Sequence, residues 1–143
     1  MTEPVRDAVA FTTISASREV IWKALTTPQQ IKKYLFGSDV ESTWEVGSPI
    51  TFAGEWQGKR YEDHGVILDS EPLSLLRISH YSPLSGKPDI PENYHTVEYR
   101  IEDDADACRV TITQGNNSND AEVNESEKTW RQVLANLKDL LEG

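Results

Sequence analysis

The sequence predicts an α+β domain in which helices cover one face of a curved antiparallel sheet of about six to seven strands. Apolar residues recur at helical spacing after the first strand and again at the end of the chain. The middle of the chain alternates apolar and polar residues, and short turn signals separate the alternating segments. With 143 residues the chain suits a single domain, which we place over residues 1–143.

Helical spacing marks both ends of this domain. After a first strand over about residues 7–14, Ser17 is placed to cap a helix whose apolar stripe ends at Leu25. From Trp130 onward, apolar residues follow the helical period without interruption. This spacing predicts a long terminal helix over about residues 124–142.

A second short helix is expected directly after the first one. Thr27 precedes a proline and is followed three positions later by Gln30, which is the pattern of a capping box. The helix should therefore run over about residues 28–36, with Gly37 as the residue that ends it.

The middle of the chain is typical of half-buried antiparallel strands, because its apolar residues alternate with polar ones. Turn residues at 57–59 and 103–107 predict two hairpins. Loops are expected at residues 82–93, which contain three prolines, and at residues 115–120. The expected strands cover about residues 40–45, 50–56, 62–68, 76–80, 95–101 and 108–112.

The dimensions of these elements do not match. Seven strands side by side span roughly 33 Å, whereas a helix is only about 10–12 Å thick. The sheet must therefore curl around the terminal helix, and a space remains between them unless large side chains fill it. That space is either a cavity for a small molecule or a filled core. The side chains that could fill it are Trp44, Phe52, Trp56 and Tyr99.

Charge and composition exclude several function classes. The chain has 14 Lys and Arg against 24 Asp and Glu, so its net charge of -10 disfavours nucleic acid and anionic membranes as partners. No apolar run reaches the roughly 20 residues of a membrane span, and the N-terminus has no signal-peptide pattern. A single cysteine, Cys108, excludes a disulfide framework and fits a reducing cytoplasm.

Four segments, taken in order, carry a resemblance to a known family. They are ISASREVIWKALTTPQQIKKYLFG (residues 14–37), GVILDSEPLSLLRISHY (65–81), TVEYRIEDDADACRVTITQ (96–114) and TWRQVLANLKDLLEG (129–143). Together they resemble the START-like, or SRPBCC, superfamily, and most closely the branch named after the activator of the heat-shock chaperone ATPase. The resemblance implies a helix-grip fold, in which the sheet wraps around the long C-terminal helix. It leaves function open, because the family contains chaperone cofactors, carriers of lipids or aromatic ligands, and cyclase-like enzymes.

The sequence departs from the family pattern at three positions. Thr129 precedes Trp130 where a glycine is usual, His80 stands where a tryptophan often ends the fifth strand, and Tyr34 stands where a tryptophan is common in the second helix. These positions are expected at the cavity, so we expect them to alter ligand preference more than the fold.

The histidines are the main candidates for polar chemistry. His64, His80 and His95 each lie in a predicted strand beside apolar neighbours, and would meet at the cavity if those faces point inward. A three-histidine metal site would need the three side chains to converge, but no helical HxxxH-type spacing supports such a ligand set. We therefore expect three separate histidines, no metal and no cofactor. Glu62 shares a face with His64, as an acid–base pair would require, or as part of a solvated hairpin. Cys108 is expected to be a buried structural thiol.

We expect the chain to bind a small, mostly apolar ligand, such as a lipid or an aromatic metabolite, between the sheet and the terminal helix. His80 and His95 would supply the polar contacts that orient this ligand. The expected ligand-binding residues are Tyr34, Phe52, Trp56, His64, Ile78, His80, His95, Val97, Tyr99, Trp130 and Leu134.

Two other functions stay open. The family resemblance implies a heat-shock chaperone as a candidate protein partner. An enzyme of the cyclase or hydrolase type would instead use His80 or His95 together with Glu62 or Tyr99.

Overall fold

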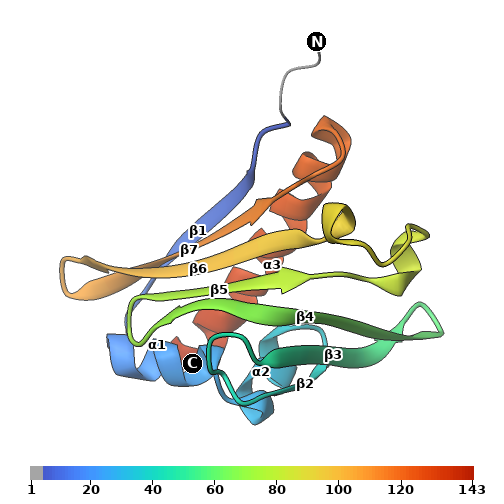
Figure 1. Cartoon of the computed structure of the whole chain (residues 1–143). Coiled ribbons are helices and arrows are strands. Elements are labelled where there is room, and N and C mark those ends of the chain that lie inside the picture. The colour runs from blue at the N-terminus through green and yellow to red at the C-terminus, as the bar shows by residue number, and fades with distance from the viewer. Residues whose placement is uncertain (1–4) are drawn as a thin grey trace.

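The computed structural model describes residues 5–143, with the side chain of Trp56 left out. The elements, in chain order, are β1 (Ala8–Ile14), α1 (Arg18–Leu25), α2 (Pro28–Tyr34), β2 (Asp39–Ser42), β3 (Pro49–Trp56), β4 (Lys59–Glu71), β5 (Leu75–His80), η1 (Pro83–Ser85), η2 (Pro91–Asn93), β6 (His95–Asp104), β7 (Ala107–Gly115) and α3 (Asp120–Glu142) (Figure 1). The predicted α+β fold with a long C-terminal helix is confirmed.

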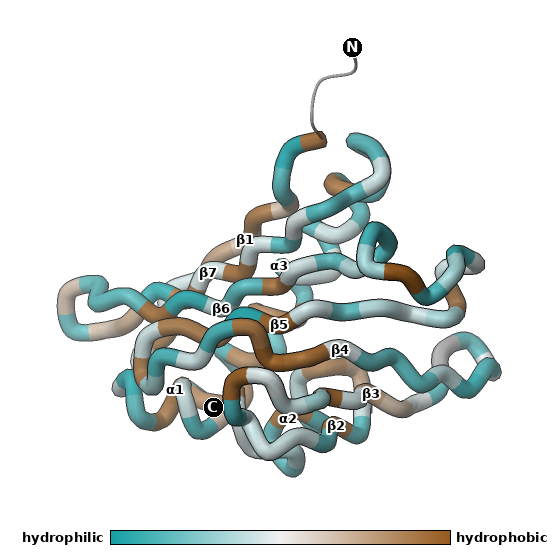
Figure 2. Tube along the Cα trace, viewed as in Figure 1, coloured by the Kyte–Doolittle hydropathy of each residue, from teal (hydrophilic) through white to brown (hydrophobic). Residues whose placement is uncertain are grey.

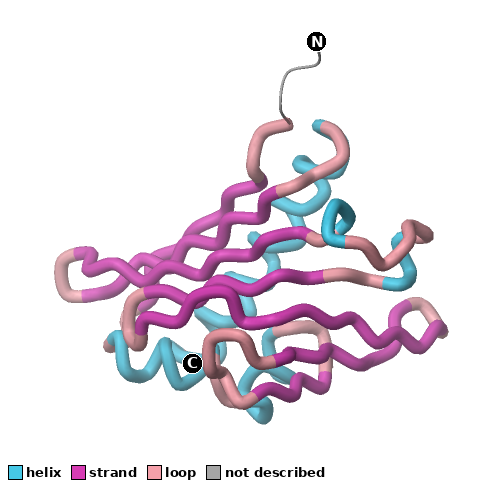
Figure 3. The backbone as a smooth tube through the Cα atoms, in the orientation of Figure 1, coloured by secondary structure: helices cyan, strands magenta, loops and turns pink. Residues whose placement is uncertain are grey.

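The strands form one antiparallel sheet in the order β1-β7-β6-β5-β4-β3-β2. The first strand of the chain therefore pairs with the last one. The helices lie on one side of the sheet (Figure 3). The long helix α3 crosses that side and contacts both β1 and α2. The face of the sheet that α3 covers is called the inner face below, and the opposite one the outer face.

The helix α3 begins four residues earlier than its apolar period predicts. Asn119 caps it by accepting a hydrogen bond from the Glu122 N–H at 2.9 Å. The first turn carries Asp120 and Glu122, whose charges suit the positive end of a helix. Val123, seven residues before Trp130, is fully buried, so the buried stripe of the helix extends further toward its N-terminus than predicted.

The two short helices follow the predicted order with two differences at their ends. Ser17 caps α1 as predicted, accepting from the Val20 N–H at 3.2 Å. The capping box predicted at Thr27 is wrong, because the Gln30 N–H that its hydroxyl would accept donates to the Thr27 carbonyl instead. The helix α2 ends at Tyr34 with Leu35 as its C-cap, so Phe36, with a φ of 50°, is the first residue after the cap. Gly37, which we predicted at that position, comes one residue later and also has a positive φ, 78°.

Alternating residues of each strand build the core against α3. Val133, Leu134 and Leu137 of the helix are each 1% exposed. Three consecutive apolar residues of β4 (Figure 2) do not all belong to this core. Ile67 is fully buried on the inner face, whereas Val66 and Leu68 on either side of it lie on the outer face. Within residues 5–143, no helix has the length and apolar character needed to cross a membrane.

Candidate functional site

A cavity of about 700 Å³ lies between the inner face of the sheet and α3. Strands β3 to β7 provide one wall, and Trp130 and Val133 of α3 provide part of the facing one. Phe36 and Leu84 are 44% and 51% exposed and lie at the rim. The apolar side chains that line the cavity are Leu35, Phe36, Phe52, Ile78, Leu84, Val97, Tyr99, Trp130 and Val133.

The indole of Trp130 is fixed as part of the helix wall. Its Nε1–H donates to Gln114 Oε1 at 2.9 Å, and its ring meets Tyr99 edge to face with the centroids 6.1 Å apart. The amide nitrogen of Gln114 donates to Asn117 and to Ser126, each at 2.9 Å. Because these bonds engage both ends of the Gln114 amide, it holds the indole in one orientation.

Asp63 and His80 form the polar corner of the cavity. The Nε2 atom of His80 lies 3.0 Å from Asp63 Oδ2, and the two side chains are 29% and 14% exposed. Asp63 Oδ1 is buried and has no hydrogen-bond partner among the described residues. The edge of His80 packs against the Phe52 ring at 5.5 Å between centroids. A carboxyl group with one hydrogen-bond partner among the described residues thus lies beside an aromatic wall.

Side chains that carry hydroxyl groups also line the cavity, among them Ser38, Tyr61 and Tyr99. The hydroxyls of Tyr61 and Ser38 lie 2.6 Å apart and satisfy each other. Burial raises the pKa of the Tyr99 phenol well above its ordinary value. Tyr99 therefore stays protonated at neutral pH and offers a neutral polar group to the cavity.

The structure brings together part of the predicted ligand-binding set. The side chains that line the cavity are Phe52, Ile78, His80, Val97, Tyr99 and Trp130. The predicted wall residue Trp56 lies outside the described side chains.

Tyr34 and Leu134 lie in the core instead of the cavity. The Tyr34 side chain is 3% exposed and donates to the Ala24 carbonyl at 2.9 Å, which joins α2 to α1. It borders a separate void of only about 20 Å³, too small for an organic molecule. Leu134 is 1% exposed and packs into the core, while its neighbour Val133 takes the wall position.

His64 lies on the outer face of the sheet, so the three histidines do not converge. Alternation along β4 turns Tyr61, Asp63 and Ile67 inward and His64 outward, in register with a bridge to Tyr81. His64 Nε2 lies 2.9 Å from Asp89 Oδ2 and 3.0 Å from the Tyr94 hydroxyl. Glu62 shares this outer face, so it is not available to His80 as an acid–base partner.

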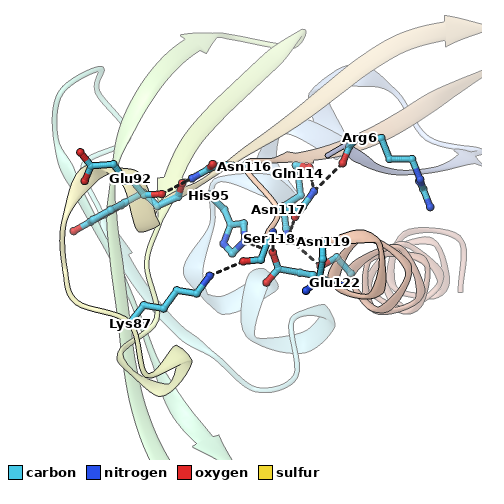
Figure 4. Close-up of polar contacts among 12 residues, drawn as sticks. Arg6, Lys87, Glu92, His95, Gln114, Asn116, Asn117, Ser118, Asn119 and Glu122 are labelled. Atoms are coloured by element: carbon cyan, nitrogen blue, oxygen red, sulfur yellow. Dashed lines mark hydrogen bonds and ion pairs between the residues drawn. The ribbon is translucent and has the colours of Figure 1, made fainter. Parts of the chain in front are cut away.

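His95 faces the beginning of α3 and does not line the cavity (Figure 4). Its Nε2 atom lies 3.2 Å from Glu122 Oε1, which also accepts from the Ser118 N–H at 2.7 Å. Lys87 reaches the Ser118 hydroxyl from the segment that follows β5 (Figure 4). The predicted ligand contact of His95 is thus replaced by a structural one that ties β6 to the helix.

Replacing Glu122 by Gln tests the contacts that Glu122 makes with Ser118 and His95, because these contacts should make the stability of the protein depend on pH. Burial alone would raise the pKa of Glu122, but the Ser118 N–H and His95 lower it below its ordinary value of 4.5. A carboxyl whose pKa is lowered by folding stabilises the protein above its unfolded pKa and loses that effect as pH falls through the folded pKa. Glu122→Gln is expected to reduce the free energy of unfolding by about 1 kcal/mol at pH 7.

The difference between Glu122→Gln and the parent chain should disappear as the pH falls below 4.5. Urea unfolding followed by circular dichroism between pH 7 and pH 3 measures it. Glu125→Gln, on an exposed position of the same helix, is the control and should shift stability little at any pH. If the difference in stability between Glu122→Gln and the parent chain were constant across this pH range, the stabilising role given to the Glu122 carboxylate would be contradicted.

Cys108 is a buried structural residue, as predicted. It is 5% exposed, and burial raises the pKa of its thiol. A thiol in this state is a poor nucleophile. Within the described part of the chain, no three His, Cys, Asp or Glu side chains lie close enough together to hold a metal ion.

Sequence reasoning missed Asp63, Tyr61, Ser38 and Gln114, which all line the cavity. The signal for Gln114 was present, because it continues the alternation of Cys108, Val110 and Ile112 on the inner face. For β4, the apolar residues Val66 and Leu68 led us to predict that their face of the strand is the inner one, and this is wrong. The inner positions of that strand near the cavity are polar, so apolar alternation could not reveal them.

Comparison with known proteins agrees with this geometry. The model of the family described as "Activator of Hsp90 ATPase homolog 1-like protein" matches residues 15–142. The chain belongs to this family. Among solved structures, the chain is similar to the solution structure of ChR145 from Cytophaga hutchinsonii, with 45% identity and a TM-score of 0.86. That match covers 99% of this chain and 97% of ChR145.

More distant structures share the fold of this chain. The solution structure of the Aha1 dimer from Colwellia psychrerythraea is 24% identical, covers 95% of this chain and 96% of that one, and has a TM-score of 0.73. DynU16, a putative protein of the dynemicin biosynthetic locus, is 16% identical with a TM-score of 0.80, and the match covers 97% of this chain and 48% of that one. No curated protein matches the chain.

Proposed function

We propose that this chain binds one small, mostly apolar molecule, lipid-like or aromatic, between the sheet and α3. The observation that carries the proposal is the cavity of about 700 Å³ with aromatic walls. Sites for small molecules typically measure about 300–1,000 Å³, are lined mainly by apolar side chains, and contain a few convergent polar groups. The cavity has each of these properties, with Asp63 and His80 as its polar corner.

Burial of apolar surface would supply the affinity. A bicyclic aromatic molecule that buries about 200 Å² of apolar area gains about 5 kcal/mol, before the cost of association is subtracted. Phe52, Tyr99 and Trp130 offer ring faces and edges for such a ligand. The exposed rim residues Phe36 and Leu84 would be the first that it meets.

Fluorescence titration with the apolar dye N-phenylnaphthylamine tests the proposal. We expect saturable binding at one site per chain with a micromolar dissociation constant, and displacement of the dye by long-chain alcohols. The dye reports on its own environment, so it requires no assumption about the natural ligand. A linear, non-saturating signal with this dye, and no binding across a panel of lipids and aromatic compounds, would overturn the proposal.

A second candidate function is docking to a heat-shock chaperone, and membership of the activator family favours it. The assay is stimulation of the ATPase of the chaperone from the same organism, with binding of the two purified proteins measured in parallel. If stimulation and binding are both absent, this function is excluded. Its outcome is independent of the dye titration.

A further inference from the structure

We infer that the cavity selects molecules that carry a hydroxyl group on an apolar body, and that Nδ1 of His80 accepts the hydrogen of that group. The inference rests on the proposed function, because it names the class of ligand for the same cavity. It is carried by the geometry of the polar corner, Asp63 and His80.

The first step concerns the proton on His80. Its Nε2 atom lies 3.0 Å from Asp63 Oδ2, and an ionised carboxylate can only accept a hydrogen bond. When one proton is shared between a carboxylate and an imidazole, it resides on the more basic imidazole. The hydrogen of neutral His80 is therefore on Nε2, and Nδ1 carries a lone pair.

The second step is that, among the described residues, Asp63 has no other partner to replace this hydrogen bond. Its Oδ1 atom is buried and has no hydrogen bond within the described part of the chain. If the hydrogen of His80 moved to Nδ1, both oxygens of a largely buried carboxylate would lack a donor. Leaving a buried charged group unpaired costs more than an ordinary hydrogen bond contributes. Asp63 thus holds His80 in one tautomer.

The third step is that Nδ1 of His80 remains accessible. Among the described residues that are not exposed, one side-chain nitrogen or oxygen has neither a hydrogen bond nor contact with solvent, and it is Asp63 Oδ1. Nδ1 of His80 is therefore not such a sealed atom. Among the described residues, His80 has a hydrogen bond through Nε2 and none through Nδ1, so Nδ1 must keep some contact with solvent. Since His80 lines the cavity, its free acceptor is within reach of a molecule there.

The surroundings decide which molecules gain from this acceptor. Phe52 packs on His80, and Ile78 and Val97 continue the wall beside it, so apolar side chains flank this acceptor. A hydroxyl group would satisfy Nδ1, whereas an ether would displace water from it without replacing the hydrogen bond. A carboxylate would place a negative charge near Asp63 and opposite a lone pair. Hydroxyl-bearing ligands should therefore bind more tightly than ethers or acids of the same shape.

Three probes with one aromatic body test the inference: a naphthol, the corresponding methoxynaphthalene and the corresponding naphthoate. Their affinities are measured by displacement of N-phenylnaphthylamine in mildly alkaline buffer, which keeps imidazole groups neutral. We expect the naphthol to bind about tenfold more tightly than the methoxynaphthalene, and the naphthoate to bind most weakly.

The variant Asp63→Asn should abolish this preference. An amide can donate a hydrogen bond to Nε2 as well as accept one from it, so the hydrogen of His80 is no longer held on Nε2. The preference is measured as the ratio of the two affinities within the variant, and this ratio should fall to about one. Glu62→Gln is the matched control, since it removes the same charge from the adjacent, exposed position on the outer face. It should retain the tenfold preference.

The tautomer is also measured directly in the unligated parent chain, by long-range proton–nitrogen NMR correlations of His80. A hydrogen on Nδ1 would overturn the inference whatever the behaviour of Asp63→Asn. Equal affinities for the naphthol and its ether would overturn it and leave the proposed function intact. Failure of all three probes and of the dye to bind would overturn the proposed function itself.

Discussion

Gly65→Ala is expected to destabilise the chain by about 3 kcal/mol or more. Gly65 lies in β4, and a Cβ atom there would be 1.7 Å from the Ser79 carbonyl oxygen of β5. The obstacle is backbone, so it cannot move aside by rotating a side chain. The two strands would have to separate at the point where His64 pairs with Tyr81.

Urea unfolding of purified protein, followed by circular dichroism, measures this loss. Gly54→Ala adds the same methyl group to the neighbouring strand β3, where the nearest atom is the Tyr61 hydroxyl at 2.6 Å. A side-chain end can shift, so Gly54→Ala should cost clearly less. Equal losses for the two variants would contradict the role given to the close approach of β4 and β5.

This close approach also concerns the cavity. Asp63 lies two residues before Gly65 on β4, and its partner His80 follows Ser79 on β5. Separating the strands at Gly65 would therefore also separate the polar corner. We expect any folded fraction of Gly65→Ala to have lost the preference for a naphthol over its ether.

The second large effect is expected from narrowing the cavity from both sides. Val97 on the sheet wall and Val133 on the helix wall are both buried and both line the cavity. The double variant Val97→Trp and Val133→Trp should weaken binding of N-phenylnaphthylamine by at least about tenfold, because the new rings occupy space that the dye needs. Stability should change moderately, since the rings enter open volume instead of a packed core.

The matched control places the same two replacements on the outer face. Val9 and Val66 are 44% and 39% exposed, so Val9→Trp with Val66→Trp adds equal aromatic surface away from the cavity. This control should bind the dye as the parent chain does. Unchanged affinity in the cavity variant, or an equal loss in both, would place the binding site elsewhere.

The architecture was predictable from the sequence because it depends on periodic patterns. The helical spacing from Trp130 onward and the turn residues at 57–59 and 103–107 specify a helix and hairpins without reference to the rest of the chain. The mismatch between a broad sheet and a narrow helix predicted a space between them, and the choice between a cavity and a filled core needed coordinates.

The polar part of the site was not predictable, because it depends on which face of β4 points inward. The apolar residues Val66 and Leu68 suggested that His64 faces the core, but the strand presents Asp63 and Tyr61 to the cavity instead. The pairing of Asp63 with His80 follows from strand register, which a single sequence does not specify. The same holds for Gln114, whose role depends on the position of Trp130.

The indole N–H of Trp130 provides the most direct measurement of ligand binding in the cavity. This group donates to Gln114 in the helix wall, so its proton–nitrogen NMR signal reports on the interior. On saturation with N-phenylnaphthylamine, we predict that this signal shifts together with the amide signals of Val97 and His80, while those of Val9 and Val66 stay in place. Saturable dye binding that shifts the outer-face signals and leaves Trp130 unchanged would contradict an interior ligand site.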